Sequence, residues 1–358
     1  MRVGYLIDVH KGGASSDGTP PAYETMEAMI EEGILAEQAG FHSIQIPDRH
    51  ARRECYFPGP EQLLTILARE TERVAIGSFT FIGTLVHPMK AAEQFSVIDN
   101  LSRGRLFTTI SRGFFPLFWG QFGIPQEHML GRFQETIRVW REAFKGERFD
   151  FPGKYWQVEQ GLLAPAPHQQ GGWPIWGGGN AVMAAIRRCA EYAECWTCDP
   201  LPLDPAVWKE QSSAYRERAT ELGKKPFIVL MRDGWVADSF EEAADEFGSL
   251  FAREARFYHR QGIFTHHPDF QDEADITARS VGPHLIMGTP SRCVEQLERY
   301  HEEFGVDYVV ICARLTPGPS LEKTREQIQR FGEEVVKPIH RKYPAAPDHP
   351  AIPAACRW

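Results

Sequence analysis

The sequence alternates strand-like and helix-like stretches along nearly its whole length, and this alternation limits the possible folds more than any other feature. The stretches typical of strands are short and apolar: residues 2–9, 43–47, 73–81, 105–111, 174–180, 195–198, 226–237 and 306–313. Helical spacing marks the segments between them, including 22–39, 60–71, 128–144 and 319–336. Repeated strand–helix units form parallel sheets, so eight of them favour an α/β fold of the closed (β/α)8 TIM barrel type. An open doubly wound sheet is the alternative.

Two stretches are too long to be ordinary connections between barrel elements. Residues 145–173 contain "GERFDFPGKYWQVEQG", which is typical of a hairpin, and residues 238–288 are helical and then rich in His, Asp and Gly. Long insertions after barrel strands commonly form lids or binding loops. We therefore expect insertions after strands 4 and 7, with a lid at about 238–288. A single barrel domain is expected over 1–340, followed by a C-terminal tail at 341–358.

Composition narrows the class of protein. The chain of 358 residues has 39 Lys and Arg against 48 Asp and Glu, which argues against nucleic acid or an anionic membrane as a partner. No apolar run approaches the roughly 20 residues of a membrane span, and the N-terminal stretch is too short for a signal peptide. Seven cysteines do not suggest a disulfide framework, so a cytoplasmic location is expected. Cys195 and Cys198 should lie on opposite faces of a strand, as core thiols.

Polar residues directly follow the second predicted strand, where barrel enzymes place their active sites. Asp48, Arg49 and His50 come in a row. His50 has a side chain suited to general acid or base catalysis, although a packed loop histidine is the structural alternative. The same end of the barrel should also carry His10, Thr80, Arg112 and residues 178–180.

Three features point to an anion at this end of the barrel, and each has an ordinary structural alternative. The strand–glycine–helix sequence "IWGGGNAVMAAIRR" can bring backbone N–H groups close to a phosphate, or it is a tight turn. Arg112, at the end of the fourth strand, can grip a phosphate with two hydrogen bonds, or pair with a loop acid. Arg132 can reach the same anion, or lie solvated on its helix.

The histidines do not predict a metal site. Asp8 and His10 resemble half of a barrel metal site, but no further ligands accompany them. The stretch "YHRQGIFTHHPD", which holds His259, His266 and His267, is interpreted as part of a polar lid.

Several landmarks occur in an order that resembles a known family. They are "AEQAGFHSIQIPDRH", "FGIPQEHMLGRFQETIRVWREAF", "LLAPAPHQQGGWPIWGGGN" and "MGTPSRCVEQLERYHEEFGVDYVVI". Over about 1–340 the chain resembles the bacterial luciferase-like flavin-dependent monooxygenases. The resemblance implies the TIM barrel, a homodimer, and reduced FMN delivered by a separate NAD(P)H:flavin reductase. Some members of the family use F420 instead.

The resemblance also implies roles for individual residues around the flavin. Arg112 and Arg132 would contact the phosphate, and Gly178, Gly179 and Asn180 would form a second wall. A non-prolyl cis peptide would join Phe79 and Thr80 under the flavin ring, with Ser111 beside them.

At the second strand the chain departs from the luciferases. They have an acid and two histidines there, whereas this chain has Asp48, Arg49 and His50, so aldehyde bioluminescence is not expected. His50 would handle protons and Asp48 would orient its neighbours. Arg49 would bind an anionic or carbonyl-bearing substrate, or pair with Asp48. The aromatic residues that follow Arg112 would form an apolar pocket wall, or pack on the barrel exterior; they are Phe114, Phe115, Phe118 and Trp119.

The implied function is oxygenation of a small organic substrate by O2 through a C4a-peroxyflavin. Aldehydes, alkanes, sulfonates, terpenes and natural-product intermediates are candidate substrates. An F420-dependent hydride-transfer oxidoreductase and a non-catalytic flavin-binding protein are the alternatives, and a metal-dependent barrel hydrolase is a more distant one.

Overall fold

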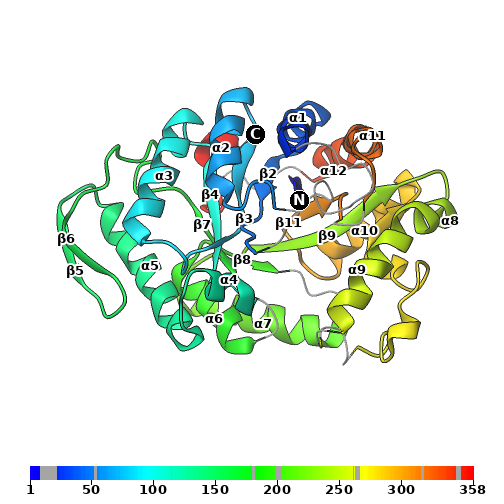
Figure 1. Cartoon of the computed structure of the whole chain (residues 1–358). Helices are drawn as coiled ribbons and strands as arrows, with labels where there is room; N and C mark the ends of the chain where they lie inside the picture. Colours follow the sequence, from blue (N-terminus) through cyan, green and yellow to red (C-terminus); the bar gives the residue numbers. More distant parts are fainter. Residues whose placement is uncertain are drawn as a thin grey trace.

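Eight parallel strands close into a barrel (Figure 1), as the alternation predicts. This computed structural model describes residues 1–8, 22–51, 55–113, 115–179, 182–198, 204–260, 262, 267–315, 318–343 and 348–358. In barrel order the strands are β1 (Arg2–Leu6), β2 (Ser43–Ile46), β3 (Ala75–Ile82), β4 (Leu106–Ser111), β7 (Ile175–Gly178), β8 (Cys195–Cys198), β9 (Ile228–Val236) and β11 (Tyr308–Cys312). Pairing of β8 with β9 and of β11 with β1 completes the ring, so the open doubly wound sheet is excluded.

Helices connect these strands and cover the outside of the barrel. They are α1 (Ala22–Ala39), α2 (Pro60–Glu70), α3 (Pro88–Leu101), α5 (Met129–Ala143), α6 (Met183–Tyr192), α7 (Pro205–Glu221), α10 (Pro290–Glu302), α11 (Leu321–Phe331) and α12 (Lys337–Lys342). Proline stands in the first turn of α2, α3, α7 and α10, where its missing N–H costs no hydrogen bond. The sequence analysis did not assign α7 or α10.

Both insertions lie where the sequence predicts them. Between β4 and β7 the chain forms α4 (Pro116–Gln121), α5 and the hairpin of β5 (Phe149–Pro152) and β6 (Gln157–Gly161). After β9 it forms α8 (Phe240–Ala243), α9 (Ser249–His259) and β10 (Ile286–Gly288), which pairs with the end of β9. The hairpin and α8 lie on opposite sides of the barrel (Figure 1).

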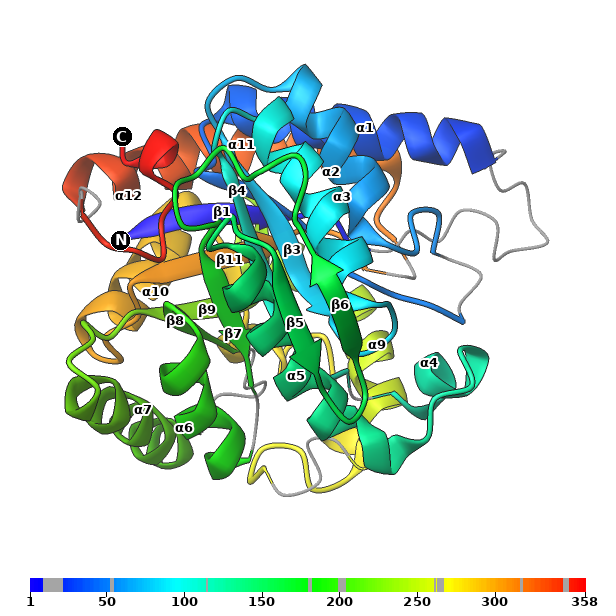
Figure 2. The same cartoon turned by 90° about the vertical axis from the view of Figure 1, so that its left-hand side faces the viewer.

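The barrel interior is closed at its N-terminal end by the last residues of the chain. Ile352 is 2% exposed and packs with inward-facing strand residues such as Phe107. Trp176 donates its indole N–H to the carbonyl of Ala351 at 2.6 Å, and His42 Nε2 lies 2.8 Å from the carbonyl of Cys356. Figure 2 shows both termini at this end of the molecule, with α4 towards the other.

The cysteines confirm two expectations. None of the seven forms a disulfide. Cys195 packs inside the barrel and Cys198 in the outer core under the helices, because neighbouring odd-spaced residues of a strand face opposite ways. Within the described residues, no helix is long and apolar enough to cross a bilayer.

Candidate active site

Asp48 fixes the end of β2 against β3 and lies against His50. Its carboxylate Oδ2 accepts the backbone N–H of Ile82 at 2.8 Å, and its own N–H donates to the carbonyl of Thr80 at 3.4 Å. His50 Nε2 lies 2.7 Å from Asp48 Oδ1. The Asp48 side chain is only 4% exposed, so its carboxylate faces His50 and the end of β3 rather than solvent. The role of orienting its neighbours, which is expected of Asp48 from the sequence, stays a prediction.

Aromatic residues in α4 and directly after it lie against His50. The ring centroids of Phe118 and Phe122 lie 6.2 Å and 4.9 Å from that of His50, both edge to face. Phe118 and Trp119 are 4% and 5% exposed and form a separate small core with Ile82, against which Phe115 packs. Phe118 therefore packs in this small core and also contacts the histidine, and the apolar pocket wall stays a prediction. Phe114 lies outside the described residues.

Arg49 pairs with Asp8 rather than with Asp48. Its guanidinium lies 2.8 Å from the Asp8 carboxylate at the end of β1. Burial alone would lower the pKa of Arg49, but Asp8 and a hydrogen bond with Tyr258 outweigh burial and raise it. Tyr258 belongs to α9, so Arg49 joins the barrel mouth to the second insertion. The Tyr258 contact could not be predicted from the sequence, because that residue lies in a long insertion.

Glu61 is a site residue that the sequence analysis missed. It lies in the first turn of α2, just after Pro60. Burial raises its pKa to about 7, and neighbouring Asp48 adds to the rise while His50 opposes it. A carboxyl group that titrates near neutral pH therefore lies close to the Asp48–His50 pair. In the sequence, the clue to Glu61 was its place just after the loop that follows the second strand.

The ends of β3, β4 and β7 form a narrow cradle. The peptide between Phe79 and Thr80 is cis, as the resemblance implied. Thr80 Oγ1 and Ser111 Oγ lie 2.7 Å apart. A Cβ at Gly178 would lie 3.0 Å from Thr80 Cγ2 and 3.2 Å from Ser111 Cβ, so only glycine fits comfortably at the end of β7. The structure thus brings together four of the predicted flavin-binding residues.

Two arginines beside this cradle have no acidic partner among the described residues. Arg112 is exposed at the end of β4. Arg132 donates from Nε to the carbonyl of Thr84 at 2.8 Å, and its guanidinium carbon lies 3.9 Å from the ring centroid of Trp156. Burial lowers the pKa of Arg132. Thr84 also donates its hydroxyl to the carbonyl of Arg112, at 3.2 Å, so one threonine links the two chain segments.

This donor set fits the phosphate of a flavin nucleotide. An anion would supply the negative charge that no described acid supplies, and guanidinium groups bind phosphate oxygens with good geometry. The salt bridge to a loop acid, the structural alternative for Arg112, is not present among the described residues. Trp156, at the tip of the hairpin, supports Arg132 and was not predicted; the aromatic pair in "KYWQ" was its only sequence clue.

The glycine turn after β7 is only partly described. Gly179 donates its N–H to the carbonyl of Thr197 at 3.3 Å and accepts the indole N–H of Trp196 at 2.6 Å, which ties the turn to β8. Asn180 and His10, both predicted at this end of the barrel, lie outside the described residues.

Known proteins similar to this chain identify its family. The family model described as luciferase-like monooxygenase matches residues 1–307. The oxygenase component of the flavin-dependent trigonelline monooxygenase of Acinetobacter baylyi is 26% identical over 330 residues, which cover 87% of this chain and 89% of that relative.

Solved structures agree on the fold. The oxygenating constituent of 3,6-diketocamphane monooxygenase of Pseudomonas putida, in complex with FMN, superposes with a TM-score of 0.80 at 19% identity, covering 94% of this chain and 98% of that one. An F420-dependent secondary alcohol dehydrogenase gives a TM-score of 0.68 at 15% identity, covering 93% and 98%. At such identities these likenesses concern the barrel alone.

Proposed function

The chain belongs to the luciferase-like monooxygenase family and is a flavin-dependent monooxygenase, and from that premise we propose that it binds reduced FMN supplied by a separate NAD(P)H:flavin reductase. The trigonelline relative is named as an oxygenase component, which supports a separate reductase. The observation that carries the choice of a flavin nucleotide is the cradle of Thr80, Ser111 and Gly178 beside two arginines without described acidic partners.

In this proposal the chain's own residues bind the cofactor and exclude water. Arg112 and Arg132 hold the phosphate, and the cradle at the ends of β3, β4 and β7 holds the ring. Reduced flavin, when bound, supplies the electrons with which O2 is activated. The aromatic cover from α4 and the contact of α9 with Arg49 limit water at the barrel mouth, which protects a reactive oxygen species from side reactions.

His50 is the residue that holds or moves a proton at Nε2. Its ring lies between the Asp48 carboxylate, which orients it, and the rings of Phe118 and Phe122. Arg49 is already paired with Asp8, so we propose that it positions α9 over the mouth and contacts a small organic substrate only through its remaining N–H groups. A homodimer and a cytoplasmic location complete the proposal; the absence of disulfides supports the latter.

An F420-dependent hydride transfer on the same barrel is the second candidate function. The fold that this chain shares with the F420-dependent alcohol dehydrogenase supports this second candidate. Hydride transfer needs no oxygen, so the two candidates differ in their response to O2.

The test is an anaerobic titration of the purified protein with FMNH2 and, separately, with reduced F420, followed by rapid mixing with O2. Tight FMNH2 binding and a long-lived oxygen-dependent absorbance change are expected. His50→Ala should shorten the lifetime of that species by about 100-fold, the lower range for losing a proton-handling group. His168→Ala, which removes an exposed histidine elsewhere, is the matched control. Tighter binding of reduced F420, with no oxygen-dependent absorbance change, would overturn the proposal that the cofactor is reduced FMN.

A further inference from the structure

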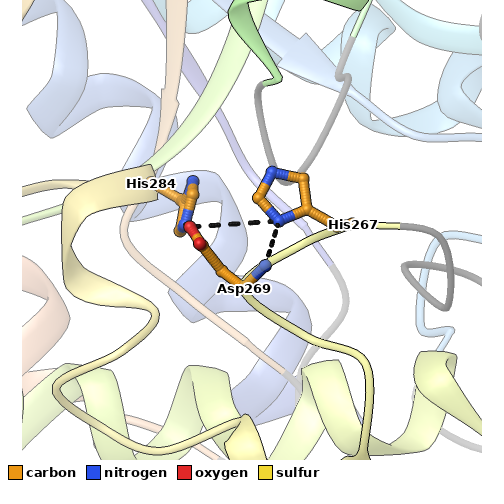
Figure 3. Close-up of side chains that lie close together, drawn as sticks. All are labelled: His267, Asp269 and His284. Atoms are coloured by element: carbon orange, nitrogen blue, oxygen red, sulfur yellow. Dashed lines mark hydrogen bonds and ion pairs between the residues drawn. The ribbon is translucent and has the colours of Figure 1, made fainter.

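The second insertion holds a cluster of metal-binding side chains outside the flavin cradle. His267 and Asp269 lie in the loop after α9, and His284 ends the short 3-10 turn before β10. Figure 3 shows the Asp269 carboxylate next to His284 and the ring of His267 beside the pair, with the two imidazole planes nearly perpendicular at 89°. One potential ligand atom from each residue lies within 4.8 Å of the other two.

The distances suit a common metal ion. His284 Nε2 lies 3.1 Å from Asp269 Oδ2, and His267 Nδ1 lies 3.9 Å from the same oxygen. Bonds of about 2.0–2.2 Å to a tetrahedral zinc ion place ligand atoms roughly 3.4 Å apart. The two spacings to the Asp269 oxygen lie on either side of that value, and all three ligand atoms lie within 4.8 Å of one another. A small rotation of the imidazole rings would bring the nitrogens into register.

The hydrogen bonds of the two imidazoles show what a metal ion would replace. His267 Nδ1 accepts the backbone N–H of Asp269 at 3.1 Å, so its lone pair becomes available to a metal ion only when the ring turns away from that N–H. His284 Nε2 is paired with the Asp269 carboxylate, and a metal ion would take the place of the proton between them. Arg232 disfavours positive charge at His284, which sets a limit on the affinity.

The loop around the cluster is held in shape by α9. Arg256 donates to the carbonyl of Ile276 at 2.6 Å, and Arg260 pairs with Glu273 at 2.5 Å. His259 Nε2 lies 3.2 Å from the carbonyl of Phe270. The ligand side chains therefore start from a partly organised position, which reduces the entropy that binding must overcome.

A purely structural role explains only part of this arrangement. Capping of a turn accounts for His267, whose ring accepts the N–H of Asp269. It does not account for the second histidine, which is 9% exposed as a residue and directs its Nε2 at a carboxylate that is 57% exposed. Two largely buried histidine side chains beside one exposed carboxylate resemble a zinc site with three protein ligands, in which a water molecule takes the fourth position.

We propose that His267, Asp269 and His284 bind a divalent transition metal ion of the zinc type, which fastens the 267–284 loop. Two imidazole nitrogens and one carboxylate oxygen favour zinc-like ions over Mg²⁺ and Ca²⁺, which prefer oxygen ligands. The three ligands come from both ends of the loop, since His284 lies 15 positions after Asp269. The sequence analysis interpreted His267 as part of a polar lid and predicted no metal site, because it did not connect His284 with it.

The first test is binding of Zn²⁺ to the tag-free, thiol-reduced protein by isothermal titration calorimetry, with Mg²⁺ as the comparison ion. We expect saturable binding of one Zn²⁺ per chain and none of Mg²⁺. Asp269→Asn and His284→Ala should each raise the Kd for Zn²⁺ about tenfold or more, given how far even supporting residues change metal affinity. Asp269 is exposed, so Asp269→Asn should still fold, and weaker Zn²⁺ binding by this variant would not be due to unfolding. His168→Ala should leave the Kd unchanged.

Limited proteolysis gives a second readout that is independent of the calorimetry. Arg279 is exposed between Asp269 and His284 and offers a trypsin site within the loop. Saturating Zn²⁺ should slow cleavage there in the wild-type chain and in His168→Ala, but not in Asp269→Asn. Absence of Zn²⁺ binding, binding unchanged in both ligand variants, or equal binding of Mg²⁺ would overturn the proposal. None of these outcomes depends on whether the barrel binds FMN.

Discussion

Glu61 carries the most informative pH dependence of any single residue at the barrel mouth. Burial raises the pKa of its carboxyl group from 4.5 to about 7. Between these two values the folded chain retains a proton that the unfolded chain has released. The contribution of Glu61 to stability is therefore greatest below pH 4.5, falls as the pH rises towards 7, and stays at its least favourable value above that.

Replacing this carboxyl group with a neutral amide should remove that dependence. We compare the free energy of unfolding of Glu61→Gln with that of the wild type. The difference, variant minus wild type, should be about 1–3 kcal/mol larger at pH 8 than at pH 5, because a shift of one pKa unit corresponds to about 1.4 kcal/mol. Urea unfolding of the flavin-free protein at the two pH values measures this difference. Glu70→Gln, an exposed change at the other end of α2, is the control. An equal stability difference at both pH values would contradict the prediction.

Single residues were predictable from the sequence where they follow directly from the end of a strand. Asp48 and His50 come immediately after β2, so the barrel rule was enough to place them at the mouth. The partner of Arg49 was not predictable, since Asp8 and Asp48 both stand near strand ends and only the packed side chains decide between them. Glu61 was missed because its raised pKa arises from burial by the assembled fold.

Among the elements, the β5–β6 hairpin has a defined relation to the proposed phosphate site. Its turn brings the backbone N–H groups of Tyr155 and Trp156 to the Glu135 carboxylate on α5, both at 2.9 Å. Trp156 then lies against the guanidinium of Arg132 and donates its indole N–H to the Arg132 carbonyl at 3.1 Å. The hairpin therefore orients a residue of the neighbouring helix.

Removing this aromatic support should weaken FMN binding without removing the charge. We expect Trp156→Leu to raise the Kd for reduced FMN about 2- to 30-fold, matching the roughly 0.5–2 kcal/mol of a cation–π contact. Fluorescence or calorimetric titration under anaerobic conditions measures it. Phe149→Leu, at the open end of the same hairpin, should have no effect on the Kd. Arg132→Ala should weaken binding more than Trp156→Leu does. A Kd unchanged in both would show that Arg132 is not a phosphate ligand.

The helices and strands could be predicted from hydrophobic periodicity more reliably than the contacts between them. Each barrel strand was placed to within a few residues, and so were α1, α2 and α5, because long apolar patterns persist through local irregularities. The hairpin was also recognised. Its docking on α5 could not be predicted, since it depends on Glu135, an acidic residue in mid-helix with no pattern that marks it as a partner of the hairpin turn.

On the scale of the whole molecule, the two ends of the barrel are closed by different parts of the chain. The mouth is covered by α4 and α9, which belong to the insertions, whereas the N-terminal end is sealed by residues 348–358. A barrel domain over 1–340 and a tail at 341–358 were predicted from the sequence. That boundary stays a prediction, and the packing of Ile352 against inward-facing strand residues provides the means to test it.

If the seal is part of the barrel's core, a single substitution in it should affect global unfolding. We expect Ile352→Ala to lower the free energy of unfolding by about 2–5 kcal/mol, the usual range for emptying a buried isoleucine site. Ala355→Ser, an exposed change three residues further on, should cost little. Urea denaturation followed by tryptophan fluorescence suits the measurement, because Trp176 bonds directly to Ala351. Since His50 and the two arginines proposed to bind phosphate lie at the opposite end, reduced FMN should still bind the folded variant with unchanged affinity. A chain with Ile352→Ala as stable as the wild type would show instead that residues 348–358 merely rest on a barrel that is complete without them.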